Sequence, residues 1–365
     1  MIRVLHCVND MKRAGLETMI MNYYRKIDKT KIQFDFLTHR EKPGAYEEEI
    51  IKLGGKIYRA PRLYPKNYFS YFRFMKNFFN EHSEYKIVHS HIDAMSFMPL
   101  LAAKMNNIPI RIAHSHSNSI EKDYKFVLKE LFRFALPKVA NEYMACSEIA
   151  AKYLFGKRET IILPNAVDAE KFYFNSNYRD NIRKELKIDN SFVVGHVGRM
   201  DKVKNHEYLL AVFKELLMID SNCILMLVGD GDNKEKLKEK ADKLNIKDNV
   251  LFLGNRDDTN KLYQAMDILI FPSKFEGFGI VPIEAQYAGL SCLVSDVLPK
   301  EVKFSDDFHF LNINSSPKEW ADEAALVINR KNNRKINIVN NTYDINNTYK
   351  ILEDYYCNLY NKVKH

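Results

Sequence analysis

The chain alternates short apolar runs with segments of helical spacing from its first residues onward, and this alternation limits the folds open to it. Short apolar runs bounded by polar residues or glycines are typical of strands buried in a parallel sheet. In the first part of the chain we predict such strands at 2–9, 34–37, 57–58, 85–91, 110–116, 142–147 and 160–165. Strands that alternate with helices, here at 19–27 and 46–53, predict a doubly wound α/β sheet.

The alternation stops at a polar segment, 175–181, and then starts again. In the second part, strands are predicted at 192–198, 223–228, 250–253, 266–271 and 291–295, with helices at 181–186, 205–217, 233–244, 259–265 and 318–328. A chain of 365 residues is also longer than one hydrophobic core usually accommodates. We therefore predict two Rossmann-like domains, 1–167 and 168–345, that face each other across a ligand cleft. A closing amphipathic helix within 346–365 is expected to pack back towards the first domain.

The stretch 271–289 carries the strongest functional signal. A glycine-rich turn with Gly277 and Gly279 leads directly from a strand into a helix, and glycines there let a ligand approach the backbone. The free N–H groups and the dipole of a helix start favour an anionic ligand. Glu276 lies in the turn and Glu284 inside the helix, so the two carboxylates are expected to have different roles.

The stretch 195–205 is the second functional signal. Its glycines keep the loop after a strand thin, so Arg199 and Lys204 can converge on one ligand. Arginine offers a planar fork to phosphate oxygens, whereas lysine offers a compact charge. One such pair alone is more often two surface cations, but a second glycine-rich helix start in the same domain favours an anion site.

Two other nucleotide-binding patterns are weak or absent. Gly229-Asp-Gly231 follows a strand, but Lys234 stands where a dinucleotide-binding GxGxxG motif requires glycine or alanine. The sequence also has no GxxxxGK[ST] motif, which argues against phosphoryl transfer by a P-loop enzyme.

Two pairs of histidines close successive strands, His89 with His91 and His114 with His116. Residues two apart on a strand point to the same face. Such pairs raise the question of a metal site, but no DxD-like carboxylate partner lies nearby in the sequence, and the cysteines form no CxxC pair. We therefore expect these histidines to position a polar substrate, with a structural role as the alternative for His89 and His91.

The positive charge lies in the first half of the chain. Residues 1–165 carry 27 Lys and Arg against 17 Asp and Glu, whereas the remainder carries 28 against 30. The basic and aromatic segment 59–79 is either an interfacial anchor or a helix with its aromatic residues in the core.

The hypothesis of a nucleic-acid-binding protein would rest on the positive charge alone, since the sequence contains no nucleic-acid-binding motif. No apolar run reaches the roughly 18 residues of a spanning helix, so we expect a cytoplasmic protein at the inner face of the membrane.

Several motifs together resemble the retaining nucleotide-sugar glycosyltransferases of family 4, which have the GT-B fold. The motifs of the second half are Gly198-Arg-Met-Asp-Lys-Val-Lys-Asn205, Leu227-Val-Gly-Asp-Gly231, Phe252-Leu-Gly254, Phe271-Pro-Ser273 and Glu276-Gly-Phe-Gly-Ile-Val-Pro-Ile-Glu284. Leu163-Pro-Asn-Ala-Val-Asp168 and Gly15-Leu-Glu17 match motifs of the family's first domain. Within the family, the chain is most similar to bacterial exopolysaccharide and capsule enzymes.

The resemblance implies roles for individual donor-site residues. Arg199 and Lys204 would hold the donor diphosphate and supply the charge that Mg²⁺ supplies in other transferases. Glu276 would bond to the hydroxyls of the sugar, and Glu284 to those of the ribose. The remaining donor-binding positions implied are Gly15, Gly198, Gly277, Phe278, Gly279 and Ile280. His114 is similar to the family histidine beside the transferred sugar, with His116 as the competitor, and His91 and His116 are expected on the acceptor side.

The resemblance also implies the reaction. We expect a metal-independent, retaining transfer without a cofactor, from a UDP-sugar ahead of a GDP-sugar, to a carbohydrate or an undecaprenyl-type lipid-linked acceptor. The basic first domain would contact the membrane peripherally, and no nucleic acid is expected as a partner. A nucleotide-sugar epimerase or phosphorylase of the same fold is the alternative. Ala14, Ala166 and Lys300-Glu301 depart from the family pattern, which leaves the donor open.

Overall fold

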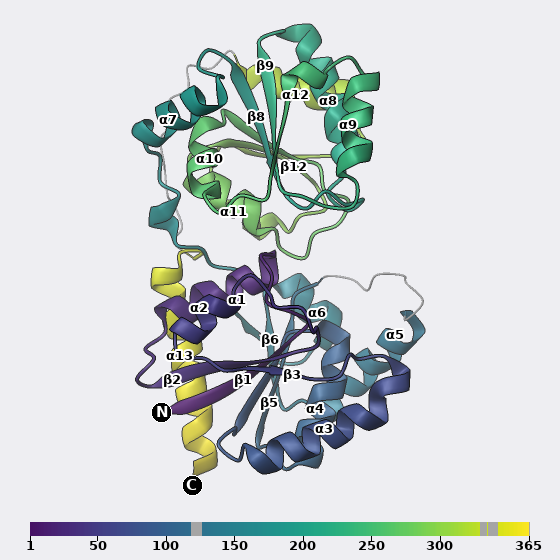
Figure 1. The fold of residues 1–365 in the computed structure, drawn as a ribbon, viewed down its shortest axis with the longest axis vertical. Helices are drawn as coiled ribbons and strands as arrows, with labels where there is room; N and C mark the ends of the chain where they lie inside the picture. Colours follow the sequence, from purple (N-terminus) through teal and green to yellow (C-terminus); the bar gives the residue numbers. More distant parts are fainter. Residues whose placement is uncertain (118–125, 329–333, 335–341, 365) are drawn as a thin grey trace. The chain divides into compact units, whose positions relative to one another are not determined.

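The computed structural model describes residues 1–117, 126–328, 334 and 342–364, and the chain forms two compact units (Figure 1). The first unit contains Met1–Val167 and the C-terminal segment Thr342–His365, and the second contains Asp168–Asn341. The closing helix α13 (Ile345–Lys364) is therefore part of the first unit, where it packs on α1 (Gly15–Lys26). Each unit has its own sheet and its own core, and the two are described separately.

The sheet of the first unit has seven parallel strands in the order β3-β2-β1-β4-β5-β6-β7. The strands are β1 (Ile2–Val8), β2 (Ile32–Thr38), β3 (Ile57–Arg59), β4 (Ile87–Ser90), β5 (Ile110–Ser115), β6 (Glu142–Ala145) and β7 (Ile161–Ile162). Helices cover both faces, so β2 and β4 are buried at every position. The predicted doubly wound parallel sheet is confirmed for this unit.

The helices of the first unit form two layers. They are α1, α2 (Glu47–Lys52), α3 (Tyr68–Glu81), α4 (Phe97–Met105), α5 (Phe126–Ala135), α6 (Glu148–Phe155) and α13. Figure 1 shows α13, in yellow, beside α1, while α3 and α4 lie on the other face of the sheet, and each layer has its own apolar core. Helices α5 and α6 were not among the predicted elements.

The aromatic side chains of the segment 59–79 lie mostly in the core or against it. Its second part forms α3, in which Tyr71, Phe78 and Phe79 are buried against the sheet. Phe69 is the exception, because 75% of it is exposed. Across the described helices, none combines the length and the apolar character that crossing a bilayer requires.

The sheet of the second unit has six parallel strands in the order β10-β9-β8-β11-β12-β13. The strands are β8 (Phe192–Val197), β9 (Cys223–Val228), β10 (Val250–Gly254), β11 (Ile268–Phe271), β12 (Ser291–Ser295) and β13 (Phe308–Leu311). From β8 the chain runs outward to β10 and then returns to β11 on the other side of β8. The strand order therefore reverses between β8 and β11, which is where open α/β sheets bind ligands.

The helices of the second unit are α7 (Ser176–Leu186), α8 (His206–Ile219), α9 (Lys234–Lys243), α10 (Thr259–Ala265), α11 (Ile280–Tyr287) and α12 (Pro317–Ile328). The polar segment predicted as a break is instead the start of α7. Asn175 caps this helix, since its side chain accepts a hydrogen bond from the backbone N–H of Tyr178. The edge strand β13 was not predicted.

Candidate active site

The loops that follow β8 and β11 lie at one edge of the sheet of the second unit. The two strands pair in parallel, with Val194 opposite Ile268, so both loops leave from carboxyl ends. Hydrogen bonds tie the loops to each other, from the backbone N–H of Lys274 to the carbonyl of Val203 (2.8 Å) and from Asn205 Nδ2 to the carbonyl of Pro272 (3.1 Å). The two stretches with the strongest functional signals therefore lie side by side and are joined by hydrogen bonds.

Lys204 and Glu276 meet on this surface. The Nζ atom of Lys204 forms an ion pair and hydrogen bond with Oε1 of Glu276, and both side chains are half-buried. The same Nζ lies 4.7 Å from the centre of the Phe271 ring, and a cation over a ring face is stabilised further. Asp201 Oδ1 holds the loop by accepting from the N–H groups of Val203 (2.9 Å) and Lys204 (3.0 Å).

Arg199 lies in the same loop as Lys204 but has a different partner. Its Nε donates to Oδ2 of Asp201 at 2.8 Å, and 67% of the side chain is exposed. Exposed ion pairs of this kind contribute little to stability. The side chain of Arg199 can therefore exchange Asp201 for a ligand. In the structure the side chains of Arg199 and Lys204 have different partners, Asp201 and Glu276.

Glycines allow the backbone packing around these loops. A Cβ atom on Gly229, which has φ +130°, would lie 2.1 Å from the carbonyl oxygen of Gly198, so the loop after β9 packs directly on the loop that carries Arg199. Gly279, with φ +83°, is the N-cap of α11, which begins at Ile280. The first-turn N–H groups of α11 thus follow the glycine turn, as predicted from the sequence.

Two further donor-side positions of the second unit lie in this turn. Gly277 lies in the turn, and Phe278 is buried there. In the first unit, Gly15 is the first residue of α1, so its N–H belongs to the start of this helix. Ala14 precedes it in an extended conformation (φ −136°, ψ 170°), which an alanine adopts without strain.

Glu284 lies within α11, one turn after the helix start. Its Oε2 accepts a hydrogen bond from the hydroxyl of Tyr263 on α10 at 2.8 Å. Burial raises the pKa of Glu284 to about 7, although the hydrogen bond from Tyr263 opposes this shift. Glu276 and Glu284 thus have different surroundings, one paired with a lysine and the other with a tyrosine.

The predicted histidines come together in the first unit, with one that the sequence analysis missed. His6 lies on β1 opposite His89 on β4, and His114 lies on the next strand, β5. His91 and His116 follow the ends of β4 and β5, and the rings of His114 and His116 are 4.0 Å apart. All five rings are packed on one another at the carboxyl ends of the three central strands.

These imidazoles are neutral at pH 7. Burial lowers the pKa of His6 and of His116 to about 3, and burial together with neighbouring histidines lowers the pKa values of His89, His91 and His114 well below the usual range. Two trios, His6/His89/His91 and His91/His114/His116, have nitrogens within 4.8 Å of one another, a distance that a metal ion could bridge. In the structure, however, these nitrogens hydrogen-bond to one another, for example His6 Nδ1 to His91 Nε2 at 2.9 Å.

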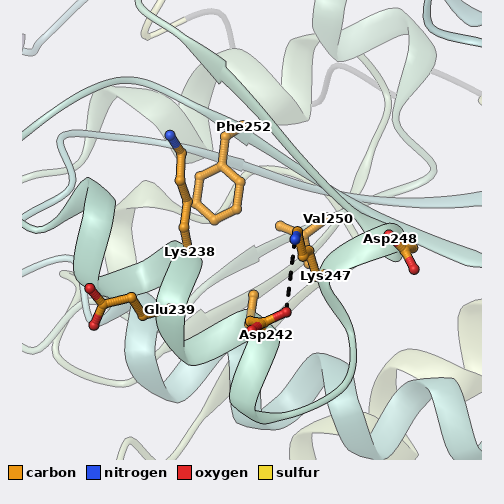
Figure 2. A pocket seen from close by; sticks show the side chains of 8 residues that line it. Lys238, Glu239, Asp242, Lys247, Asp248, Val250 and Phe252 are labelled. Carbon is orange, nitrogen blue, oxygen red and sulfur yellow. Dashed lines mark ion pairs between the residues drawn. The ribbon is translucent and has the colours of Figure 1, made fainter.

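A hollow of about 530 Å³ lies elsewhere on the second unit, between α9 and β10 (Figure 2). Figure 2 shows charged side chains around it, together with Val250 and Phe252, and the ion pair of Lys247 Nζ with Asp242 Oδ1 at 3.9 Å. None of the site residues predicted from the sequence lines this hollow. The candidate site is therefore defined by the loops after β8 and β11, and not by this cavity.

Comparisons with known proteins identify the family. Residues 13–171 match the family model for Glycosyltransferase Family 4, and residues 178–344 match that for Glycosyl transferases group 1. EpsF of Bacillus subtilis (strain 168), named as a glycosyltransferase, is 37% identical over 309 residues, which are 82% of this chain and 80% of EpsF. The chain belongs to the family 4 glycosyltransferases. Both the resemblance and the class of enzyme predicted from the sequence are confirmed.

Two further comparisons are with a named relative and with a solved structure. A UDP-Gal:alpha-D-GlcNAc-diphosphoundecaprenol alpha-1,3-galactosyltransferase of Escherichia coli is 33% identical over 230 residues, 59% of this chain and 58% of that one. The crystal structure of Anabaena HepE in complex with UDP and glucose matches with a TM-score of 0.81 over 98% of this chain and 100% of HepE, at 16% identity. The glycosyltransferase therefore has the predicted GT-B fold.

Replacing Glu284 by glutamine tests its raised pKa. A carboxyl group whose pKa is higher in the folded than in the unfolded state stabilises the protein at low pH, and this contribution is lost as the pH rises from about 4.5 to about 7. We therefore expect Glu284→Gln to melt close to the wild type at pH 5 and above it at pH 8. Thermal unfolding across this range measures the difference, with Glu207→Gln, whose carboxylate is exposed and paired with Lys240, as the control. A difference that stays constant with pH would contradict the raised pKa.

Proposed function

We propose that the glycosyltransferase moves a sugar from a nucleoside-diphosphate sugar, most readily a UDP-sugar, to a glycan or lipid-linked acceptor in surface polysaccharide synthesis. The transfer would retain the anomeric configuration and need no metal ion. The observation that carries this proposal is the ion pair of Lys204 with Glu276 beside the start of α11. In this pair a cation and a carboxylate lie side by side at the point where the strand order reverses, and we assign the cation to phosphate and the carboxylate to sugar hydroxyls.

Donor binding would replace this ion pair by two new interactions. The diphosphate would take the ammonium of Lys204, and the N–H groups at the start of α11 would face the same anion. The sugar hydroxyls would then donate to the released carboxylate of Glu276. Each charged group keeps a partner before and after binding, so neither is left buried and unpaired.

Metal independence is proposed from the charges that the chain itself supplies. As the sugar leaves, negative charge grows on the diphosphate, and fixed cations stabilise it in the transition state. Lys204 lies beside Glu276 at the start of α11, and Arg199, whose exposed side chain is paired with Asp201, could swing towards the same oxygens. Retention of configuration is proposed from membership of family 4.

The donor and acceptor classes are proposed from relatives. The E. coli relative is named for a UDP-sugar donor and a diphosphoundecaprenol-linked acceptor, and the HepE crystal structure contains UDP and glucose. A lipid-linked acceptor of this kind would be presented at a membrane surface. We propose the same classes of donor and acceptor, a UDP-sugar and a lipid-linked saccharide, for this chain.

Transfer in the presence of EDTA tests the proposal. The purified glycosyltransferase is incubated with UDP-glucose, UDP-galactose, UDP-N-acetylglucosamine or GDP-mannose and an undecaprenyl-diphosphate-linked saccharide. We expect transfer from one donor, detected by mass spectrometry, and an anomeric coupling in the NMR spectrum of the product that matches the donor. Lys204→Met and Glu276→Gln should each lower kcat by about 10²-fold or more, since each removes a charged group from the transition state.

Three results would contradict the proposal. An absolute requirement for Mn²⁺ or Mg²⁺ would exclude the metal-independent mechanism, and an inverted product would exclude retention. Release of an altered sugar without any acceptor would indicate an epimerase or a phosphorylase. Lys318→Met, which breaks an exposed lysine–aspartate pair on α12, is the control for the loss of a lysine and should leave kcat unchanged.

A membrane contact is proposed for α5 of the first unit. Val127, Leu131 and Phe134 form one stripe of this helix, at spacings of four and three residues, and are 79%, 61% and 69% exposed. The guanidinium of Arg133 lies 4.5 Å from the centre of the Phe134 ring, which places a cation beside the stripe. An exposed apolar stripe flanked by cations is typical of helices that lie in the headgroup region of an anionic bilayer.

Vesicle binding tests this contact. We expect the protein to sediment with vesicles that contain phosphatidylglycerol and much less with phosphatidylcholine alone. The double variant Leu131→Ser/Phe134→Ser should bind the anionic vesicles at least about tenfold more weakly, because it removes two large apolar side chains from the stripe. Leu326→Ser, which changes an exposed leucine on α12, is the control. Equal binding by the stripe variant and the wild type would exclude α5 as the contact.

A further inference from the structure

A chain of hydrogen bonds links the closing helix α13 to His114 through the centre of the first unit. The hydroxyl of Tyr356 lies 2.5 Å from Nδ1 of His89, and Nε2 of His89 lies 3.1 Å from Nδ1 of His114. All three side chains are fully buried. These hydrogen bonds therefore connect a helix near the C-terminus to the histidine that the family resemblance places beside the transferred sugar.

The hydroxyl of Tyr356 gives this chain a direction. Burial raises the pKa of Tyr356 well above its usual value, so the hydroxyl keeps its proton. Since the described residues offer this hydroxyl no other partner, it donates a hydrogen bond to Nδ1 of His89. A neutral imidazole carries one N–H, so the N–H of His89 must then be at Nε2, from which it donates to Nδ1 of His114. By the same reasoning His114 carries its own N–H at Nε2.

The Nε2 atom of His114 is the last atom in this series of hydrogen bonds. It is buried, and the residues that the structure describes offer it no hydrogen-bond partner. A buried N–H without an acceptor is unfavourable, so an acceptor oxygen brought by a ligand would be stabilised there. The ring of His116, half-exposed beyond the end of β5, packs 4.0 Å from that of His114 and is the neighbour that would turn aside to admit the oxygen.

We propose that Tyr356 is a positioning residue that fixes His114, through His89, as the tautomer with its proton on Nε2, so that His114 donates a hydrogen bond to an oxygen of the transferred sugar. The use of this bond in catalysis rests on the proposed function. In this role His114 is a neutral donor and does not act as a base. Tyr356 acts on the reaction without touching the substrate.

In a second series of hydrogen-bonded histidines, no group fixes the direction of the bonds. It runs from His6 through His91 to His116, with bonds of 2.9 and 3.0 Å. Both ends, Nε2 of His6 and Nδ1 of His116, are buried without a partner in the described part of the chain. The protons of this chain can point either way, because neither end carries a group like Tyr356 that fixes them.

Nitrogen NMR of histidine-labelled protein tests the proposal directly. Two-bond ¹H–¹⁵N correlations distinguish the two neutral tautomers, and we expect both His89 and His114 of the wild type to carry the proton on Nε2. In Tyr356→Phe, which keeps the ring but removes the donor, His89 and His114 should show mixed tautomers. The kcat for transfer should fall about fivefold, the equivalent of one lost hydrogen bond, with the KM for the acceptor unchanged.

Tyr355→Phe is the matched control. Tyr355 is the preceding residue of α13, and its hydroxyl donates to Oε2 of Glu142 at 2.6 Å, outside the histidine chain. This variant also loses one hydroxyl, but its histidine spectrum and its kcat should match those of the wild type. A wild-type His114 with its proton on Nδ1, or a Tyr356→Phe spectrum without change, would overturn the proposal. So would a bound metal whose chelation changes the histidine signals.

The spectra and the kinetics separate two kinds of failure. If no donor supports transfer, the proposed function fails while the tautomer measurement still stands. If transfer occurs but Tyr356→Phe changes the tautomers without lowering kcat, the positioning role fails while the proposed function stands.

Discussion

The parallel pairing of β8 with β11 determines where this glycosyltransferase places its charged residues. Because the chain returns from β10 to the other side of β8, two loops that are far apart in the sequence leave the sheet at adjacent carboxyl ends. Hydrogen bonds between Lys274 and Val203 and between Asn205 and Pro272 hold the loops together. Lys204 therefore reaches Glu276 at the start of α11, and the fold itself forms the surface that we propose for the sugar donor.

The first unit depends on a different constraint, the satisfaction of polar groups in its core. Five imidazoles lie at the ends of the three central strands, and burial keeps them neutral. Buried polar groups are stable when they are hydrogen-bonded, so the imidazoles bond to one another and to Tyr356. The closing helix α13 thus contributes to the polar interior of the first unit as well as covering the face of its sheet.

Much of the fold could be predicted from the sequence, because alternating strands and helices admit few arrangements. The loops with Lys204 and Glu276 could be assigned to one domain, but their ion pair depends on strand order, which local periodicity does not contain. His6 was missed because a single histidine in an apolar strand gives no pattern. The edge strand β13 was also missed, and it is only four residues long. The exposed stripe of α5, by contrast, could have been found from the spacing of Val127, Leu131 and Phe134.

The central claim is that donor binding exchanges the Lys204–Glu276 pair for phosphate and sugar. Calorimetric titration of the wild type, Lys204→Met and Glu276→Gln with UDP and with the UDP-sugar that supports transfer tests it most directly. The account predicts that Lys204→Met weakens both ligands at least about tenfold, because a charged hydrogen bond is lost. Glu276→Gln should bind UDP as tightly as the wild type or tighter, since Lys204 is released, but should lose affinity for the UDP-sugar. If Glu276→Gln weakens UDP as much as Lys204→Met does, the pair is structural and the claim is wrong.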